Sequence, residues 1–140
     1  MRMRTRIGHP HRGFTLVELM VAVAILAIIM AVAIPSYSDY VVRANRGEGK
    51  VAVLQTAQAL ERCFTRHNAY DAGACNLTFP IDSENDWYQV TVDDRTATTF
   101  TLTAAPQGTQ AKRDAECGGF TVTQTGLRGI TGTGTVQDCW

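Results

Sequence analysis

The stretch RGFTLVELMVAVAILAIIMAVAIP, from Arg12 to Pro35, decides the fold, because a long apolar helix has to form there. Between Phe14 and Ile34 stand 21 residues, of which only Glu18 is charged. At about 1.5 Å per helical residue this run reaches roughly 30 Å, the thickness of one bilayer core. The stretch therefore predicts a single membrane-spanning helix.

A short basic segment precedes the span and ends at Gly13. In an ordinary secretory signal an apolar region of about 7 to 15 residues precedes the cleavage site and is removed with it. Here the order is reversed, so cleavage after Gly13 would leave the apolar helix as the new N-terminus. The basic residues predict that the leader stays cytoplasmic while the rest of the chain crosses the membrane. They are Arg2, Arg4, Arg6 and Arg12, accompanied by His9 and His11.

The junction GFTLVE, residues 13–18, resembles the class III leader junction of type IV pilins and of their relatives, the type II secretion pseudopilins. The resemblance implies that a prepilin peptidase cleaves between Gly13 and Phe14 and N-methylates Phe14. It divides the chain into a leader at 1–13, a transmembrane and assembly helix at 14–35, and a periplasmic or extracellular domain at 36–140 that includes the second half of the long helix. An uncleaved single-pass anchor is the alternative.

Glu18 needs a partner within the span, because a carboxylate inside a bilayer costs a few kcal/mol. In assembled pili of this family the carboxylate of one subunit meets the N-terminal amine of its neighbour. This implies a subunit contact between Glu18 and Phe14, with Thr15 nearby. Methylation keeps the amine positively charged, so the pairing survives the modification. The alternative is an acid that reaches the membrane interface by itself.

The exported part of the chain is acidic. The whole chain carries 13 basic and 13 acidic residues, and removal of the four leader arginines leaves 9 against 13, a formal charge of −4. Because nucleic-acid-binding surfaces are basic, this balance argues against nucleic acid as a partner, although Lys112 and Arg113 form a local basic pair. About 105 residues follow the span, which is enough for one small domain.

Four cysteines lie on the translocated side, where an oxidising compartment permits disulfides. Three pairings are possible. We favour Cys63 with Cys75 and Cys117 with Cys139, since each closes a local loop and since the resemblance implies a C-terminal loop closed by a disulfide. The chain-entropy model assigns each bond about 3 kcal/mol. No cysteines have C-x-x-C spacing, so we expect neither a metal site nor a cofactor.

Pro35 follows the span, and a proline inside a helix removes one backbone hydrogen bond, so we expect a helix kink or local melting there. Helix then continues from Ser36 to about Arg66. At 100° per residue its apolar residues divide between two nearly opposite sides. One side can be covered by the chain's own sheet, and we expect the other to contact the same helix of neighbouring subunits. The first side contains Val53, Ala57, Leu60 and Phe64, and the second contains Tyr37, Tyr40, Val41, Ala44 and Val51.

Beyond the helix the pattern changes. Residues 69–86 contain glycine, proline and several Asp and Asn residues, which predicts a connecting loop. Period-two alternation predicts strands at 87–92, 98–104 and 119–125, with the DDR sequence at 93–95 as a turn and a fourth short strand at 127–130. The expected fold is α+β: a long N-terminal α-helix packed on a three- or four-stranded antiparallel β-sheet. The Gly- and Thr-rich tail at 129–134 should be flexible unless Cys139 pins it.

No nucleophile, base and orienting group form a recognisable arrangement, so the sequence predicts a structural subunit and no enzyme. The segments 44–54, 60–70 and 138–140 resemble minor pilins of the type IV pilus. The resemblance implies roles in pilus assembly, twitching motility and adhesion. It implies other pilins, the prepilin peptidase and the inner-membrane assembly machinery as partners, and an inner-membrane location before incorporation into an extracellular filament. Two alternatives remain open, a DNA-receptor pilin of competence and a type II secretion pseudopilin.

Overall fold

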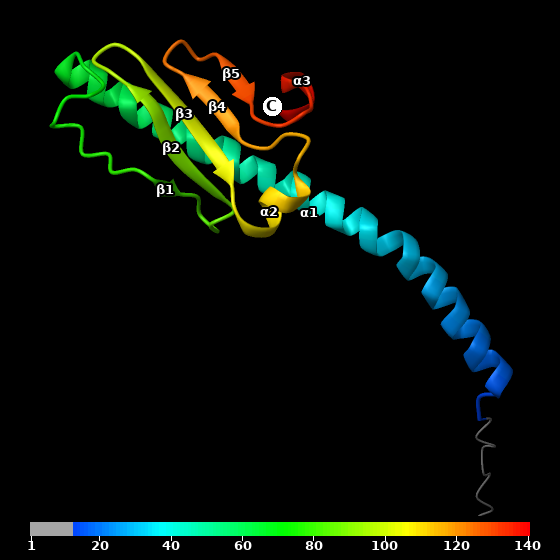
Figure 1. Ribbon diagram of the computed structural model, residues 1–140. Helices are drawn as coiled ribbons and strands as arrows, with labels where there is room; N and C mark the ends of the chain where they lie inside the picture. The colour runs from blue at the N-terminus through cyan, green and yellow to red at the C-terminus, as the bar shows by residue number, and fades with distance from the viewer. Residues whose placement is uncertain (1–12) are drawn as a thin grey trace, which may run out of the picture. The chain divides into compact units, whose positions relative to one another are not determined.

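The computed structural model describes residues 13–140, which divide into two compact units between Ser38 and Asp39. The first unit is the apolar part of one helix, and the second contains the rest of that helix together with a five-stranded sheet (Figure 1). The predicted leader lies outside the described residues, apart from Gly13.

Helix α1 (Leu16–His67) contains the predicted span apart from its first two residues, Phe14 and Thr15. Thr15 caps its start, because the backbone N–H of Glu18 donates to Thr15 Oγ1 over 3.2 Å. Among the described residues, α1 is the one helix that is long and apolar enough to cross a membrane. The helix is continuous through Pro35, so the local melting considered for that position is absent. One missing hydrogen bond is not enough to break a helix whose neighbouring turns are intact on both sides.

The sheet has the order β1-β2-β3-β4-β5, and every strand pairs antiparallel with its neighbour in sequence. The α+β prediction is confirmed, with five strands in place of three or four. The additional strand β1 was expected to be loop, because two residues after a proline are too few to show a period. The strands are β1 (Ile81–Asp82), β2 (Tyr88–Arg95), β3 (Phe100–Pro106), β4 (Phe120–Thr123) and β5 (Arg128–Ile130).

The turn between β2 and β3 lies later than predicted. Asp93, Asp94 and Arg95 belong to β2, which has a register shift between Val92 and Arg95. At this shift the Asp93 carboxylate accepts a hydrogen bond from Thr103 Oγ1 at 2.6 Å. The turn itself occupies residues 96–99, where the N–H groups of residues 98 and 99 donate to the hydroxyl of Thr96.

Two short helices occupy segments that were predicted as loop or tail. Helix α2 (Gly108–Arg113) follows β3, and helix α3 (Val136–Cys139) closes the chain. Thr135 caps α3, because its side chain accepts a hydrogen bond from the backbone N–H of Asp138. The tail at 129–134 is held in place by the bond between Cys139 and Cys117, the condition stated for it, and also because N–H groups at 131, 132, 133 and 134 donate to carbonyl oxygens of residues 119, 117, 115 and 116.

The core lies between the sheet and the second half of α1, which runs along one face of the sheet (Figure 1). Val53 and Leu60 of α1 are fully buried, as are Tyr88 and Phe120 of the sheet. Gly49, in an otherwise good helix-forming segment, lies against the Tyr88 ring. A Cβ atom there would be only 2.7 Å from Tyr88 Cδ1. The glycine is therefore required for close packing of the sheet on α1.

The opposite side of α1 remains uncovered. Tyr37, Tyr40 and Val51 are each more than half exposed, whereas Val41 is half-buried. The predicted division of α1 into a side covered by its own sheet and a side left open is therefore confirmed. An apolar side that the chain itself leaves open is suited to contact another subunit.

Candidate functional site

A buried carboxylate fixes the segment between β3 and β4 to α1. The Asp114 side chain is inaccessible to solvent and accepts hydrogen bonds from Arg46 Nε at 3.0 Å and Arg46 Nη2 at 2.8 Å. Gln110 Nε2 and the Tyr88 hydroxyl also donate to it, at 3.1 and 3.3 Å. The backbone N–H of Cys117 completes the set at 3.2 Å. A carboxylate with this many donors is a strong local organiser.

The pKa values of the groups around Asp114 follow from this arrangement. The hydrogen bond to Asp114 raises the pKa of Arg46, although partial burial opposes the shift. Burial raises the pKa of the Tyr88 hydroxyl, and the charge of Asp114 acts in the same direction. Arg46 thus stays charged and Tyr88 stays neutral at any physiological pH.

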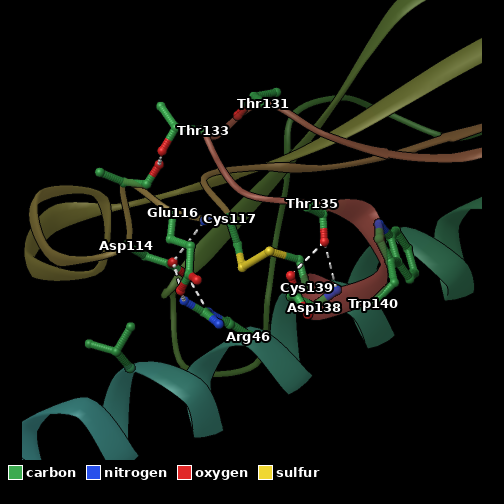
Figure 2. Close-up of a disulfide and its surroundings, with 12 residues drawn as sticks. Arg46, Asp114, Glu116, Cys117, Thr131, Thr133, Thr135, Asp138, Cys139 and Trp140 are labelled. Carbon is green, nitrogen blue, oxygen red and sulfur yellow. Dashed lines mark hydrogen bonds and ion pairs between the residues drawn. A yellow bond between two sulfur atoms is a disulfide. The ribbon is translucent and has the colours of Figure 1, made fainter.

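The C-terminal loop is attached directly to this network. Figure 2 shows Arg46 of α1 pointing toward Asp114 and Glu116, beside the disulfide between Cys117 and Cys139. Glu116 receives a hydrogen bond from Arg46 Nη2 at 2.9 Å. Gly132 passes so close to the Glu116 carbonyl that a side chain at 132 would collide with it. The disulfide therefore closes a loop that backbone hydrogen bonds and an ion pair already hold.

The Trp140 ring packs on the core, and a cationic group lies over the ring. Its ring meets Phe120 edge to face at 5.4 Å, and its Nε1 donates to the Gly129 carbonyl at 2.8 Å. The guanidinium of Arg128 lies 4.9 Å from the Trp140 ring centroid. Lys50 donates to the Trp140 oxygen at 3.3 Å, and burial followed by the charges of Arg46 and Arg128 lowers its pKa. Trp140 is therefore a cap on the core.

The basic pair predicted at Lys112 and Arg113 lies at the exposed end of α2. This helix is held firmly, because Gln110 is 2% exposed and its Nε2 donates to the Val42 carbonyl of α1 at 3.1 Å. Its Oε1 accepts from Asn45 Nδ2 at 3.2 Å. The two basic side chains therefore extend from a rigid support.

The other predicted residues lie in two places. Phe14, Thr15 and Glu18 lie at the start of α1, where Phe14 is 86% exposed. The structure joins Cys63 to Cys75 and Cys117 to Cys139, the pairs favoured from the sequence. The first bond links the last turns of α1 to the loop before β1. The two bonds thus lie in different parts of the domain, at the end of α1 and at the C-terminus.

The network around Asp114 was not anticipated. Arg46 and Asp114 are 68 residues apart, and Tyr88 looked like an ordinary strand aromatic. A buried ion pair has no short-range sequence signature. The sequence signal for this network was the polar pair of Gln110 and Asp114 at i,i+4 spacing. This spacing indicates a side-chain contact only if the segment is helical, and α2 was not predicted as a helix.

Two family models match the chain. One is described as "Type IV minor pilin ComP, DNA uptake sequence receptor" and matches residues 35–121, more than half of the chain. The other is described as "Prokaryotic N-terminal methylation motif" and matches residues 9–34. The first model covers the domain from Pro35 through α2 and the start of β4, and the second covers the leader junction and the span.

Curated relatives match shorter parts. A "Fimbrial protein" of Pseudomonas aeruginosa is 35% identical over 91 residues, which cover 57% of this chain and 59% of the relative. The "Type IV major fimbrial protein FimA" of Dichelobacter nodosus is 55% identical over 38 residues, 27% of this chain and 24% of the relative. The chain thus spans about three fifths of the first relative and about a quarter of the second.

Two solved structures share the fold. The non-core minor pilin PilV of Neisseria meningitidis superposes with a TM-score of 0.54 at 23% identity, covering 69% of this chain and 92% of that chain. A type IV pilin from Shewanella oneidensis superposes with a TM-score of 0.50 at 23% identity, covering 71% and 97%. At these identities the likeness concerns the fold alone.

Proposed function

The chain belongs to the type IV minor pilin family, and from this premise we propose that it binds double-stranded DNA outside the cell while it is part of a pilus. The observation that carries the proposal is the match of residues 35–121 to a model described as a DNA uptake sequence receptor. The sequence by itself favoured assembly, twitching motility and adhesion, and its acidic net charge argued against nucleic acid as a partner.

The acidic net charge does not count against this proposal, for a physical reason. At physiological ionic strength charges are screened over about 8 Å, so DNA responds to the local surface and not to the sum over the domain. Lys112 and Arg113 remain exposed on a rigid helix, as a contact for DNA phosphates requires.

A gel shift with the full chain in nonionic detergent micelles tests the proposal. The wild-type chain should retard a labelled duplex at 50 mM salt, and its affinity should fall steeply as salt rises. The pair Lys112→Gln and Arg113→Gln should reduce the magnitude of the slope of log affinity against log salt by up to about 2. The charge-preserving pair Lys112→Arg and Arg113→Lys is the control. Absence of wild-type binding at low salt refutes the DNA role, whereas an unchanged slope in the glutamine pair excludes these two side chains as the contact.

For assembly we propose the roles that the resemblance implied. The peptidase cleaves between Gly13 and Phe14 and methylates Phe14, the protein waits in the inner membrane with its C-terminus periplasmic, and the filament then takes it up. Glu18 pairs with the Phe14 amine of the neighbouring subunit, beside Thr15. Its carboxylate has no hydrogen-bond partner within the described residues, although its N–H is bonded. The expected kink at Pro35 stays a prediction.

The Glu18 role is tested by immunoblots of sheared filaments and of whole cells. In Glu18→Ala the leader should still be removed, which the shorter chain on the cell blot reports, while the amount in filaments falls. Val17→Ala, a neighbouring change that keeps the acid, is the matched control. Equal incorporation of Glu18→Ala and the wild type would remove the assigned role. A type II secretion pseudopilin, the remaining alternative, would appear in no surface filament.

A further inference from the structure

The end of α1 carries a basic pocket that the proposed contact on α2 does not include. The pocket lies beside the Cys63–Cys75 disulfide, is open, and has a volume of about 280 Å³. Arg62, Arg66 and His67 of α1 line it, together with Asn76 of the loop. All four are exposed, and none of the residues that line the pocket is acidic.

The acid next to these cations in the sequence makes its hydrogen bond to another residue. Glu61 precedes Arg62, but its Oε1 accepts a hydrogen bond from the Tyr70 hydroxyl at 2.9 Å. Within the described residues no ion pair involves Arg62 or Arg66. Like charges at i,i+4 spacing on a helix repel, so the two arginines weaken the isolated helix. A favourable interaction with the helix dipole explains Arg66 and His67 in the last turn, whereas Arg62 lies a turn earlier.

The pocket is held in shape before any ligand arrives. The disulfide joins Cys63 to a loop that turns tightly at 72–77, with backbone hydrogen bonds of 2.8 Å from residue 75 to 72 and 2.7 Å from residue 77 to 75. A site that is already ordered loses less entropy on binding. Guanidinium groups bind phosphate oxygens in a fork, and Asn76 adds an amide donor.

We propose that this pocket binds a phosphodiester of the DNA backbone, as a second contact separate from Lys112 and Arg113. The inference rests on the proposed function. Gln110 bonds α2 to α1 near residues 42–45, and the pocket lies 17–20 residues further along the same helix. At 1.5 Å per residue this is roughly 25–30 Å, so a duplex that touches both contacts lies along α1.

The test measures binding of one labelled duplex to the full chain in nonionic detergent between 50 and 300 mM salt. Arg62→Gln with Arg66→Gln should reduce the magnitude of the salt slope by about 2 and weaken binding at 100 mM salt by roughly ten- to sixty-fold. Arg62→Lys with Arg66→Lys should retain most of the affinity. The single change Arg62→Gln has a matched control in Arg43→Gln, which removes an equally exposed arginine from the same helix.

Each outcome separates the two proposals. If the wild-type chain binds and the Lys112 and Arg113 pair weakens binding, but the Arg62 and Arg66 pair does not, the pocket is refuted and the DNA role stands. If Arg43→Gln weakens binding as much as Arg62→Gln, the effect is general charge and the pocket is also refuted. If the wild-type chain binds no DNA, both proposals fail. Thermal unfolding of each variant is measured alongside, and a lower Tm with an unchanged salt slope assigns the arginines a structural role only.

Discussion

The two disulfide-closed loops of this domain are held in place in different ways. The first, Cys63–Cys75, spans 12 residues; the backbone hydrogen bonds of its segment 71–75 are short-range, and the Tyr70 N–H before that segment donates to the Ala97 carbonyl oxygen at 3.1 Å. The second, Cys117–Cys139, spans 22 residues and contains the segment 131–134, whose N–H groups donate to carbonyl oxygens in 115–119. Beneath the second loop lies Asp114 with its donors, whereas the first loop borders an open pocket.

The difference shows where rigidity comes from in each region. The first loop depends on its covalent bond, because little else ties residues 71–77 to the end of α1. The second loop would keep much of its conformation without the bond, because an ion pair and a ladder of hydrogen bonds remain. Removing one support at a time tests this contrast.

The largest effect is expected from Asp114→Ala. The change leaves Arg46 as a charge with only Glu116 to balance it and leaves the Tyr88 hydroxyl without its carboxylate acceptor, whereas Gln110 keeps the Val42 carbonyl. Loss of one partner of a buried pair costs about 3–5 kcal/mol, so the free energy of unfolding should fall by that amount. Urea unfolding measures it, with Asp114→Asn as a milder control that retains the shape. A loss under about 1 kcal/mol would show that the network does not stabilise the second loop.

Removal of either disulfide should cost about 3 kcal/mol, with the longer loop losing roughly 0.5 kcal/mol more. The informative difference is local. In Cys63→Ser with Cys75→Ser, the amides of residues 75–77 should exchange hydrogen rapidly. In Cys117→Ser with Cys139→Ser, the amides at 131–134 should stay protected, because their acceptors remain in place. Equal loss of protection in both variants contradicts the contrast between the two loops.

The smallest effect concerns two tyrosines, one in each region. Burial, with the hydrogen bond and the charge of Glu61, raises the pKa of Tyr70 to about 12. The fold therefore favours the neutral hydroxyl, so the contribution of Tyr70 is complete below pH 10 and is lost as pH rises toward 12. Tyr70→Phe should reduce the fall in unfolding free energy between pH 9 and pH 11.

The alkaline loss should not disappear in Tyr70→Phe, because burial also raises the pKa of Tyr88 in the second region. Urea titrations at the two pH values measure the effect, and Tyr88→Phe gives the comparison. An identical alkaline loss in Tyr70→Phe and the wild type would show that Tyr70 does not contribute to it.

Most of the architecture could be predicted from patterns that lie close together in the chain. The apolar run defined the span, and period-two alternation located β2, β3 and β4 to within a few residues. The prediction of two opposed apolar sides on α1 was correct, because the residues buried on one side of a helix recur with the helical period. The features that the sequence did not locate are short or depend on strand pairing. Strand β1 has two residues and helix α2 has six. The turn after β2 lies later than predicted because a register shift includes Asp93 and Asp94 in the strand.

By itself, the sequence determined that the chain has a long apolar N-terminal helix with a processing motif, an α+β domain and local cysteine pairs, because each depends on neighbours in the chain. Only the tertiary structure decided which distant residues form the stabilising ion pair and which basic residues lie together on the surface. Arg46 meets Asp114 across 68 residues, and the basic pocket forms only when a loop folds back onto α1. The net charge of a sequence does not say where on the surface the charges lie, whereas a binding surface depends on which charges the fold brings together on one side.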